Sequence, residues 1–252
     1  MSAPVDSGGE KRGILSLEGV EHARIHREWQ TTNTLWALIQ RCVALGMLLA
    51  CTPLLVVLYL PVRLSARAPF FFRQERRGFM GQSFHIVKIT TMRAGSDKNR
   101  AYEKGVSLSD PNVTWIGRIL RDLKIDELPQ LWNIVRGDME FVGPRPIAPG
   151  LDEMLAREIP GFNHRYLVKP GLTNVGQVSV LENALGDATL VDWKQRFEGE
   201  EHYINNKSIF YDLLLIAMTA LFMLRKAFKR GGKEPKQSRV LSFRRSRSRD
   251  IS

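Results

Sequence analysis

The strongest constraint on the fold is an uncharged stretch of 19 residues from Cys42 to Leu60. Ten of these residues are Leu or Val. At roughly 0.3 to 0.6 kcal/mol each, ten such residues favour a helix in a bilayer by about 3 to 6 kcal/mol. A run of this length is first a candidate for a membrane helix. A secretory signal peptide fits less well, because the run is too long and lies too far from Met1.

The pair Thr52-Pro53 lies in the middle of this run. Proline has no N–H and clashes with the carbonyl group four residues earlier, so a helix kinks there. Residues 42–52 rise only about 16 Å as a helix, roughly half of the hydrocarbon core. Arginines flank both sides of the run: Arg24, Arg27 and Arg41 before it, and Arg63, Arg67, Arg73, Arg76 and Arg77 after it. Basic residues on both flanks favour a re-entrant hairpin, and a single kinked spanning helix is the alternative. Either topology puts the downstream domain in the cytoplasm.

The net charge of +11 lies mostly in the C-terminal tail, where residues 225–252 hold eleven Lys or Arg and two acidic residues. The rest of the chain is close to neutral, so the charge alone does not indicate a nucleic-acid-binding domain. Such a tail is suited to anionic lipid headgroups, although charge alone would also suit RNA. Cys42 and Cys51 form neither a metal pattern nor a disulfide framework.

The chain between about 69 and 199 has the pattern of a compact mixed domain. Residues 83–92 alternate well enough for a strand, and residues 116–136 carry apolar side chains at helical spacing. A second apolar segment, residues 209–224, is interrupted by Asp212 and Thr219. It predicts an interfacial helix, with a core helix or a short span as alternatives.

Two neighbouring carboxylates, Asp126 and Glu127, precede Pro129. Proline is suited to a first helical turn, which would place both carboxylates at a helix N-terminus, beside unpaired N–H groups. An ionised aspartate can act as a nucleophile, and two adjacent carboxylates can hold Mg²⁺. A plain acidic helix cap has the same spacing, so the pattern alone leaves both interpretations open.

Basic residues in two other segments are candidates for binding phosphate. Arg145 stands between Pro144 and Pro146 in a stiff loop, where its guanidinium could fork onto phosphate or carboxylate. Arg76 and Lys88 form a basic neighbourhood suited to a diphosphate. A structural ion pair at Arg145, and a solvated charge run around Arg76, are the alternatives.

Taken in order, these segments resemble the bacterial sugar transferase family, the monotopic polyprenol-phosphate phosphoglycosyl transferases. The resemblance covers roughly residues 34 to 225, and this chain is similar to the small members of the family. The motifs that carry it are Arg73-Gln74-Glu75-Arg76, Phe84-His85-Ile86-Val87-Lys88, Gly117-Arg118-Ile119-Leu120-Arg121, Asp126-Glu127-Leu128-Pro129-Gln130-Leu131-Trp132-Asn133, Gly143-Pro144-Arg145-Pro146 and Lys169-Pro170-Gly171-Leu172-Thr173. The family's membrane segment is a re-entrant helix broken at a Ser-Pro-like pair, which Thr52-Pro53 matches.

The resemblance implies a two-step reaction at the cytoplasmic face of the bacterial inner membrane. Asp126 would be the nucleophile that attacks a UDP-sugar, and Glu127 its catalytic partner, both near Mg²⁺. Polyprenol phosphate would then accept the phosphosugar. Lys88, Arg145, Arg76 and Arg118 would bind the phosphates. The resemblance does not indicate which sugar is used, and a homo-oligomer stays open.

The expected fold is α/β and mostly helical, with a small cytoplasmic catalytic domain, an N-terminal re-entrant membrane helix hairpin and interfacial amphipathic helices. The predicted segments are a polar leader over 1–33, the re-entrant helix over 34–62, the catalytic domain over 63–205, an interfacial helix over 206–228 and a basic disordered tail over 229–252. A glycosyltransferase with an Asp-x-Asp metal motif is disfavoured, because the chain has no such motif. A non-enzymatic basic scaffold at the membrane, or an RNA-binding protein, would explain the tail and the apolar run but not the carboxylate pair.

Overall fold

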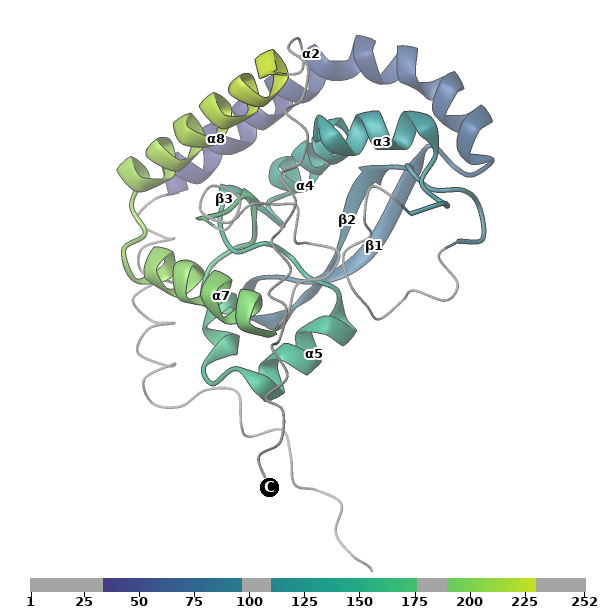
Figure 1. Ribbon diagram of the computed structural model, residues 1–252. Helices are drawn as coiled ribbons and strands as arrows, with labels where there is room; N and C mark the ends of the chain where they lie inside the picture. Colours follow the sequence, from purple (N-terminus) through teal and green to yellow (C-terminus); the bar gives the residue numbers. More distant parts are fainter. Residues whose placement is uncertain (1–33, 97–109, 176–189, 230–252) are drawn as a thin grey trace, which may run out of the picture.

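The computed structural model describes residues 34–96, 110–175 and 190–229, and the predicted leader and most of the predicted tail lie outside these ranges (Figure 1). The described part is mostly helical with two small sheets. Its elements, with η for a 3-10 helix, are α2 (Thr34–Ala66), β1 (Phe71–Arg77), η1 (Phe79–Gly81), β2 (Ser83–Ile89), α3 (Trp115–Asp122), η2 (Ile125–Gln130), α4 (Leu131–Arg136), β3 (Glu140–Val142), α5 (Pro149–Glu158), η3 (Phe162–Leu167), β4 (Gly171–Thr173), α7 (Leu190–Asn205) and α8 (Ile209–Lys229).

The apolar run forms α2, a continuous helix of 33 residues. Among the described helices, it is the one that is long and apolar enough to cross a membrane. Pro53 does not end this helix, and α2 bends along its length (Figure 1). The hydroxyl of Thr52 donates to the carbonyl oxygen of Leu48 at 3.0 Å, a back-bond that is typical of bent helices. The predicted kink is therefore a bend within one helix, and the re-entrant topology stays a prediction.

Both halves of α2 pack against the domain that follows it. Ala44, in the first half, is fully buried in a cluster with residues of β2 and α4. Val62, in the second half, is fully buried in a separate cluster with residues of β2 and α3. The middle turn points outward, since Thr52 and Pro53 are exposed. The helix therefore runs along the domain and is attached to it near both ends.

The predicted strand over 83–92 is confirmed as β2, which ends at Ile89 and pairs with β1 in an antiparallel hairpin. Directly opposite residues of such a hairpin share a face, and so do alternate residues along each strand. Arg76 is opposite Phe84, and Phe72 is opposite Lys88. The hairpin therefore brings Arg76 and Lys88 to one face, and Ile86 of the same face packs against α4.

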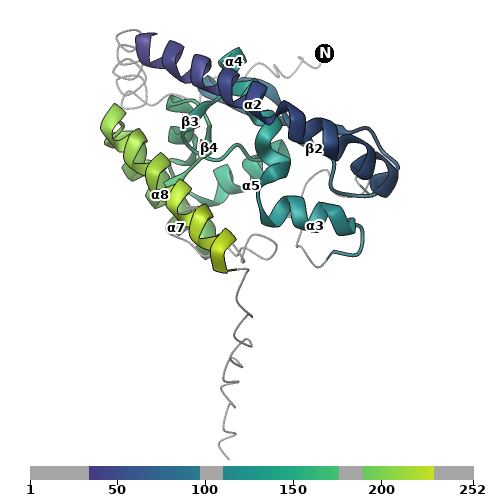
Figure 2. The ribbon, with the colours of Figure 1, turned by 90° about the horizontal axis from the view of Figure 1, so that it is seen from above.

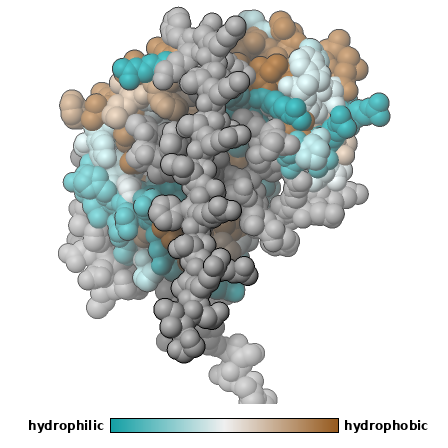
Figure 3. Space-filling model, viewed as in Figure 1, coloured by the Kyte–Doolittle hydropathy of each residue, from teal (hydrophilic) through white to brown (hydrophobic). Residues whose placement is uncertain are grey.

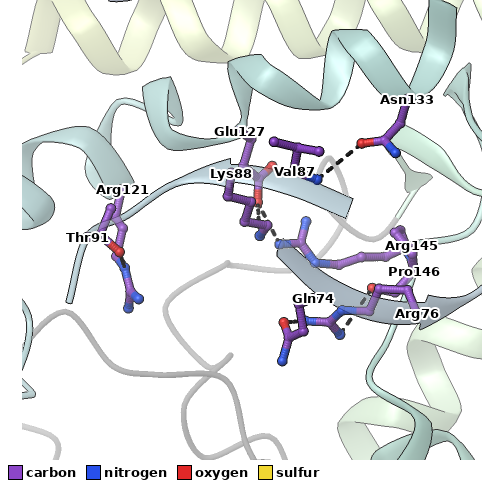
Figure 4. Close-up of polar contacts among 10 residues, drawn as sticks. All are labelled: Gln74, Arg76, Val87, Lys88, Thr91, Arg121, Glu127, Asn133, Arg145 and Pro146. Carbon is purple, nitrogen blue, oxygen red and sulfur yellow. Dashed lines mark hydrogen bonds and ion pairs between the residues drawn. The ribbon is translucent and has the colours of Figure 1, made fainter. Parts of the chain in front are cut away.

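The single helix expected over 116–136 is divided into α3, η2 and α4. Lys124, before η2, has a left-handed backbone with φ of 58°, which redirects the chain between α3 and the carboxylate pair. Asn133 of α4 fastens this segment to β2. Its side-chain amide donates to the carbonyl oxygen of His85 at 2.7 Å. It also accepts from the N–H of Val87 at 3.2 Å (Figure 4).

The second sheet joins β3 and β4 in parallel, beside the C-terminal helices. A buried cluster connects this sheet to α7 and α8; its fully or nearly fully buried members are Val142, Val168, Tyr203, Ile204 and Leu215. The N-terminal ends of α2 and α8 lie close together, and the two helices diverge from there (Figure 2). The indole of Trp36 donates to the carboxylate of Asp212 at 3.3 Å across this junction.

The predicted segment over 206–228 is helical, as α8. Its outward side is apolar, with Phe210 77% exposed and Leu224 56% exposed. In Figure 3 the apolar surface gathers along the upper edge of the molecule, where α2 and α8 lie. Trp115 of α3 and Trp132 of α4 are also exposed. Such an apolar surface indicates association with a membrane, and the interfacial position of α8 itself stays a prediction.

Candidate active site

The carboxylate pair lies in the first turn of η2, which leads directly into α4. The sequence predicted Pro129 in the first turn of an α-helix, but the structure places it inside this 3-10 helix. Asp126 is 7% exposed and Glu127 is 8% exposed. Two buried carboxylates side by side are costly unless other groups neutralise or bind them. Their partners therefore show what the site is built to do.

Glu127 has two cationic partners on the same carboxylate oxygen, Oε1 (Figure 4). The ammonium of Lys88, from β2, donates at 3.2 Å, and the guanidinium of Arg145 donates at 2.9 Å. Burial on its own raises the pKa of the Glu127 carboxyl, but the positive charges of Lys88 and Arg145 outweigh it and hold the pKa well below its usual range. Glu127 is therefore ionised and fixed between two cations.

Asp126 is in a different environment from its neighbour. Its Oδ1 atom is buried and has no hydrogen-bond partner within the described residues. Burial raises the pKa of the Asp126 carboxyl, and the negative charge of Glu127 raises it further. A buried carboxylate oxygen without a partner in its own chain is suited to an external cation or electrophile.

The residues present fit a Mg²⁺ ion. Magnesium in phosphate-handling enzymes uses one or two carboxylates and keeps water and substrate oxygens as its other ligands. Asp126 and Glu127 offer such a pair, with the unpartnered Oδ1 of Asp126 as the free donor. No group of three or more His, Cys, Asp or Glu side chains with metal-binding geometry occurs in the described ranges, so an ion here would rely on the carboxylate pair.

Asp126, Glu127, Lys88 and Arg145 form a polar cluster. Arg76 lies beside this cluster, with its guanidinium 3.4 Å from the carbonyl oxygen of Pro146 (Figure 4). Burial lowers the pKa of Arg76 to about 10, and the positive charge of Arg145 adds to this shift. The Nε atom of Arg76 is buried without a partner among the described residues. Three cationic side chains, Arg76, Lys88 and Arg145, thus lie near the two buried carboxylates, and the third cation is suited to a phosphate-bearing ligand.

Arg118, which the sequence also indicated, is exposed on α3. Within the described residues, no hydrogen bond or ion pair connects its side chain to the cluster, and its proposed role stays a prediction. Arg121, one turn further along α3, was not selected from the sequence. Its positive charge lowers the pKa of Asp126, and its Nε donates to the hydroxyl of Thr91 at 2.8 Å. Arg118 and Arg121 belong to one motif, and their spacing alone did not show which of them lies near Asp126.

Two further residues that sequence reasoning missed, Arg165 and Glu200, bind the backbone of Arg145. They lie 20 and 55 residues from Arg145 in the chain, so no local pattern could have connected them. Thr52 and Pro53 lie on α2, outside the cluster. The described site therefore unites Asp126, Glu127, Lys88, Arg145 and Arg76.

Comparison with known proteins places the chain in a family. A buried carboxylate pair among lysine and arginine side chains, on a domain with an apolar face, is suited to a phosphate-bearing ligand near a membrane. The sequence profile of the bacterial sugar transferase family matches residues 31–226. The chain belongs to this family.

Several curated relatives carry names that describe an activity. The chain is 39% identical over 172 residues to a UDP-glucose:undecaprenyl-phosphate glucose-1-phosphate transferase of Caulobacter vibrioides, covering 68% of this chain and 63% of the relative. It is 38% identical over 177 residues to an undecaprenyl-phosphate glucose phosphotransferase of Komagataeibacter xylinus, covering 69% and 32%. It is 34% identical over 191 residues to the exopolysaccharide production protein ExoY of Sinorhizobium fredii, covering 70% and 80%. The matches to the first two relatives thus span less than two thirds of those proteins.

Proposed function

We propose that this protein is a phosphoglycosyl transferase that moves a sugar phosphate from a UDP-sugar to polyprenol phosphate and releases UMP. The observation that carries the proposal is the asymmetry of the carboxylate pair. Glu127 is neutralised by Lys88 and Arg145, while Asp126 keeps a buried oxygen without a partner in the described chain. Relatives named as undecaprenyl-phosphate glucose-1-phosphate transferases support the same reaction class. A non-enzymatic scaffold would have no use for such a pair.

In the first step, an oxygen of the Asp126 carboxylate attacks the β-phosphorus of the UDP-sugar. The bond from that phosphorus to the bridging oxygen breaks, and UMP leaves with the electron pair. In the second step, an oxygen of polyprenol phosphate attacks the same phosphorus, and the Asp126 carboxylate is released. Mg²⁺, when held by Asp126 and Glu127, supplies positive charge that neutralises the diphosphate.

The cationic side chains have separate tasks in this scheme. Lys88 and Arg145 fix Glu127 in place and present positive charge to phosphate oxygens as charge develops on the leaving UMP. Arg76 adds a third cation and a free Nε donor at the edge of the cluster. Glu127 and Asp126 also have different roles. Glu127, held by its two cationic contacts, positions charge, whereas Asp126, with its raised pKa, reacts.

The packing of α2 supports a re-entrant arrangement on the cytoplasmic face. Ala44 and Val62 are 18 residues apart, which corresponds to about 27 Å along a helix. A straight helix crossing the bilayer would carry one of these positions away from a domain on one side. Both are fully buried against the same domain, and the exposed turn between them contains Thr52 and Pro53. In our proposal the middle of α2 dips into the bilayer and both ends return to the domain.

Substitution of Asp126 by Asn tests the reaction. After incubation with UDP-glucose and Mg²⁺, without lipid acceptor, intact mass spectrometry of the wild-type protein should show one added hexose phosphate. Asp126→Asn should show none, and its UMP release should fall by orders of magnitude, because the anionic nucleophile is gone. The same assay is repeated with UDP-N-acetylgalactosamine and other UDP-sugars to identify the donor sugar.

Asp212→Asn is the matched control. Asp212 is a buried aspartate outside the cluster, bound to Tyr203 and Trp36. Its replacement should lower stability and leave the adduct in the folded fraction. A folded Asp126→Asn protein that turns over at a near-normal rate would refute the nucleophile.

A further inference from the structure

Arg145 is held through its backbone on both sides. Its N–H donates to Oε1 of Glu200 at 3.2 Å. Its carbonyl oxygen accepts from the guanidinium of Arg165 at 2.6 Å. The same Arg165 nitrogen, Nη2, also donates to the Glu200 carboxylate at 3.2 Å. The three residues thus form a closed ring of polar contacts around one peptide segment.

Arg165 lies on η3 and Glu200 on α7, two elements far along the chain from the carboxylate pair. Both residues are more deeply buried than the site itself. The two side chains are 2% and 7% exposed. Arg165 also stacks on the ring of Phe162, 4.7 Å from its centroid, and that ring packs against Phe197. A buried ion pair contributes little to stability by itself, because desolvation offsets the attraction. The structural effect of this pair is to hold the backbone of Arg145 in place.

The carbonyl oxygens of Pro144 and Pro146 accept hydrogen bonds from the N–H of Gly171 at 3.0 Å and from the guanidinium of Arg76 at 3.4 Å. Pro144 and Pro146 have no N–H, however, so Arg145 offers the one backbone donor of the Pro-Arg-Pro segment, and Glu200 accepts from it. The segment also borders a small surface opening, lined in part by Arg77 and Tyr166.

We propose that Arg165 and Glu200 are positioning residues, which set the orientation of the Arg145 guanidinium toward Glu127 and the reacting phosphate. The pair acts through the backbone of Arg145 and touches no reacting atom. Arg145 Nη2 lies 2.9 Å from Glu127, and a loop shift of about 1 Å would lose such a contact and with it a large part of the rate. This role rests on the proposed function, because the reacting phosphate is that of the UDP-sugar.

The test is a double-mutant cycle with Arg165→Met, which keeps an unbranched apolar side chain and removes the donors. In the wild-type background this change should lower kcat for UMP release by about 10- to 100-fold, the effect of losing hydrogen bonds to charged groups. In an Arg145→Ala background the same change should have almost no further effect, because its target is already absent. Arg165→Lys should recover part of kcat, since it restores one cationic donor.

Glu140→Gln is the matched control, since Glu140 forms an equally buried pair with Lys207 that does not contact Arg145. It should lower kcat to the same small extent in both backgrounds. An equal loss for Arg165→Met in both backgrounds would make the pair merely structural and overturn the proposal, while leaving the transferase reaction intact.

A readout independent of activity is hydrogen–deuterium exchange. Within Pro144-Arg145-Pro146 the one exchanging backbone amide is that of Arg145. Its exchange should accelerate about tenfold or more in Arg165→Met and stay unchanged in Glu140→Gln. Unchanged exchange in Arg165→Met overturns the proposal, even for a protein that transfers no sugar phosphate. If instead no UDP-sugar yields UMP with the wild-type protein, the proposed function fails, and accelerated exchange still shows that the pair holds the loop.

Discussion

Asp126 and Glu127 are adjacent in the chain, yet their surroundings move their pKa values in opposite directions. Glu127 has Lys88 and Arg145 within hydrogen-bonding distance, whereas the nearest positive charges to Asp126 act without a bond to its Oδ1. Titratable neighbours whose pKa values are pushed apart mark a division of chemical roles. The carboxyl with the raised pKa is the one with an oxygen free to react.

The raised pKa of Asp126 predicts the pH dependence of the first step. Attack requires the ionised carboxylate, so the rate falls as the pH drops through the folded-state pKa, and this fall begins at a higher pH than for an ordinary aspartate. Arg121 lowers the pKa of Asp126 by its positive charge. In Arg121→Met the acidic limb of the rate should therefore move to higher pH.

The measurement is the pH profile of UMP release, with Lys194→Met as the control. Lys194 is exposed on α7, outside the cluster, and its removal should leave the limb in place. An acidic limb that moves to lower pH in Arg121→Met would contradict the assignment of Asp126 as the titrating nucleophile.

At the scale of elements, the long apolar run was enough to predict a helix at α2, the second apolar segment predicted the helicity of α8, and alternation predicted the strand β2. The break between α3 and η2 was not predictable, because it depends on a left-handed backbone at Lys124. Lysine carries no signal for this conformation, and no glycine marks the turn. The ring of contacts around Arg145 was also hidden, since Arg165 and Glu200 meet it only through tertiary packing. The carboxylate pair and the Pro-Arg-Pro loop could be selected because their residue types are unusual within a short span.

The re-entrant arrangement that we propose for α2 predicts that both ends of the helix face the cytoplasm. Single cysteines, introduced as Val20→Cys and Pro69→Cys in a background without Cys42 and Cys51, should both react poorly with a membrane-impermeant thiol reagent added to intact cells. Both should react after the membrane is permeabilised. Labelling of Val20→Cys in intact cells would contradict the re-entrant arrangement and favour a spanning helix.

At the scale of the whole molecule, α2 presents an apolar surface on its outer side and contributes buried residues to the core on its inner side. Its outer side is exposed along most of its length, while Ala44 and Val62 complete two separate clusters of the domain that follows it. Full burial of a side chain such as Val62 contributes about 1.5 to 3 kcal/mol, a large share of the net stability of a domain.

Removal of residues 1–66 should therefore not yield a stable soluble fragment. Without α2, the faces of β2, α3 and α4 that it covers would be exposed to water, and we expect aggregation or loss of cooperative unfolding. Removal of residues 1–33 alone is the control, because it leaves α2 complete; this variant should stay folded in detergent. Circular dichroism and size-exclusion chromatography distinguish the two, and a monomeric, cooperatively unfolding 67–252 fragment would contradict the role of α2 in the core.

The double attachment of α2 also has a consequence for biosynthesis. The helix precedes the rest of the domain in the chain, so the ribosome delivers it first, and we expect its apolar side to reach lipid before the domain is complete. The strands and helices that follow then condense onto the side of α2 that the lipid leaves uncovered. We therefore expect a chain that misses the bilayer to pack poorly around Ala44 and Val62, and so to misplace the segments that hold the carboxylate pair.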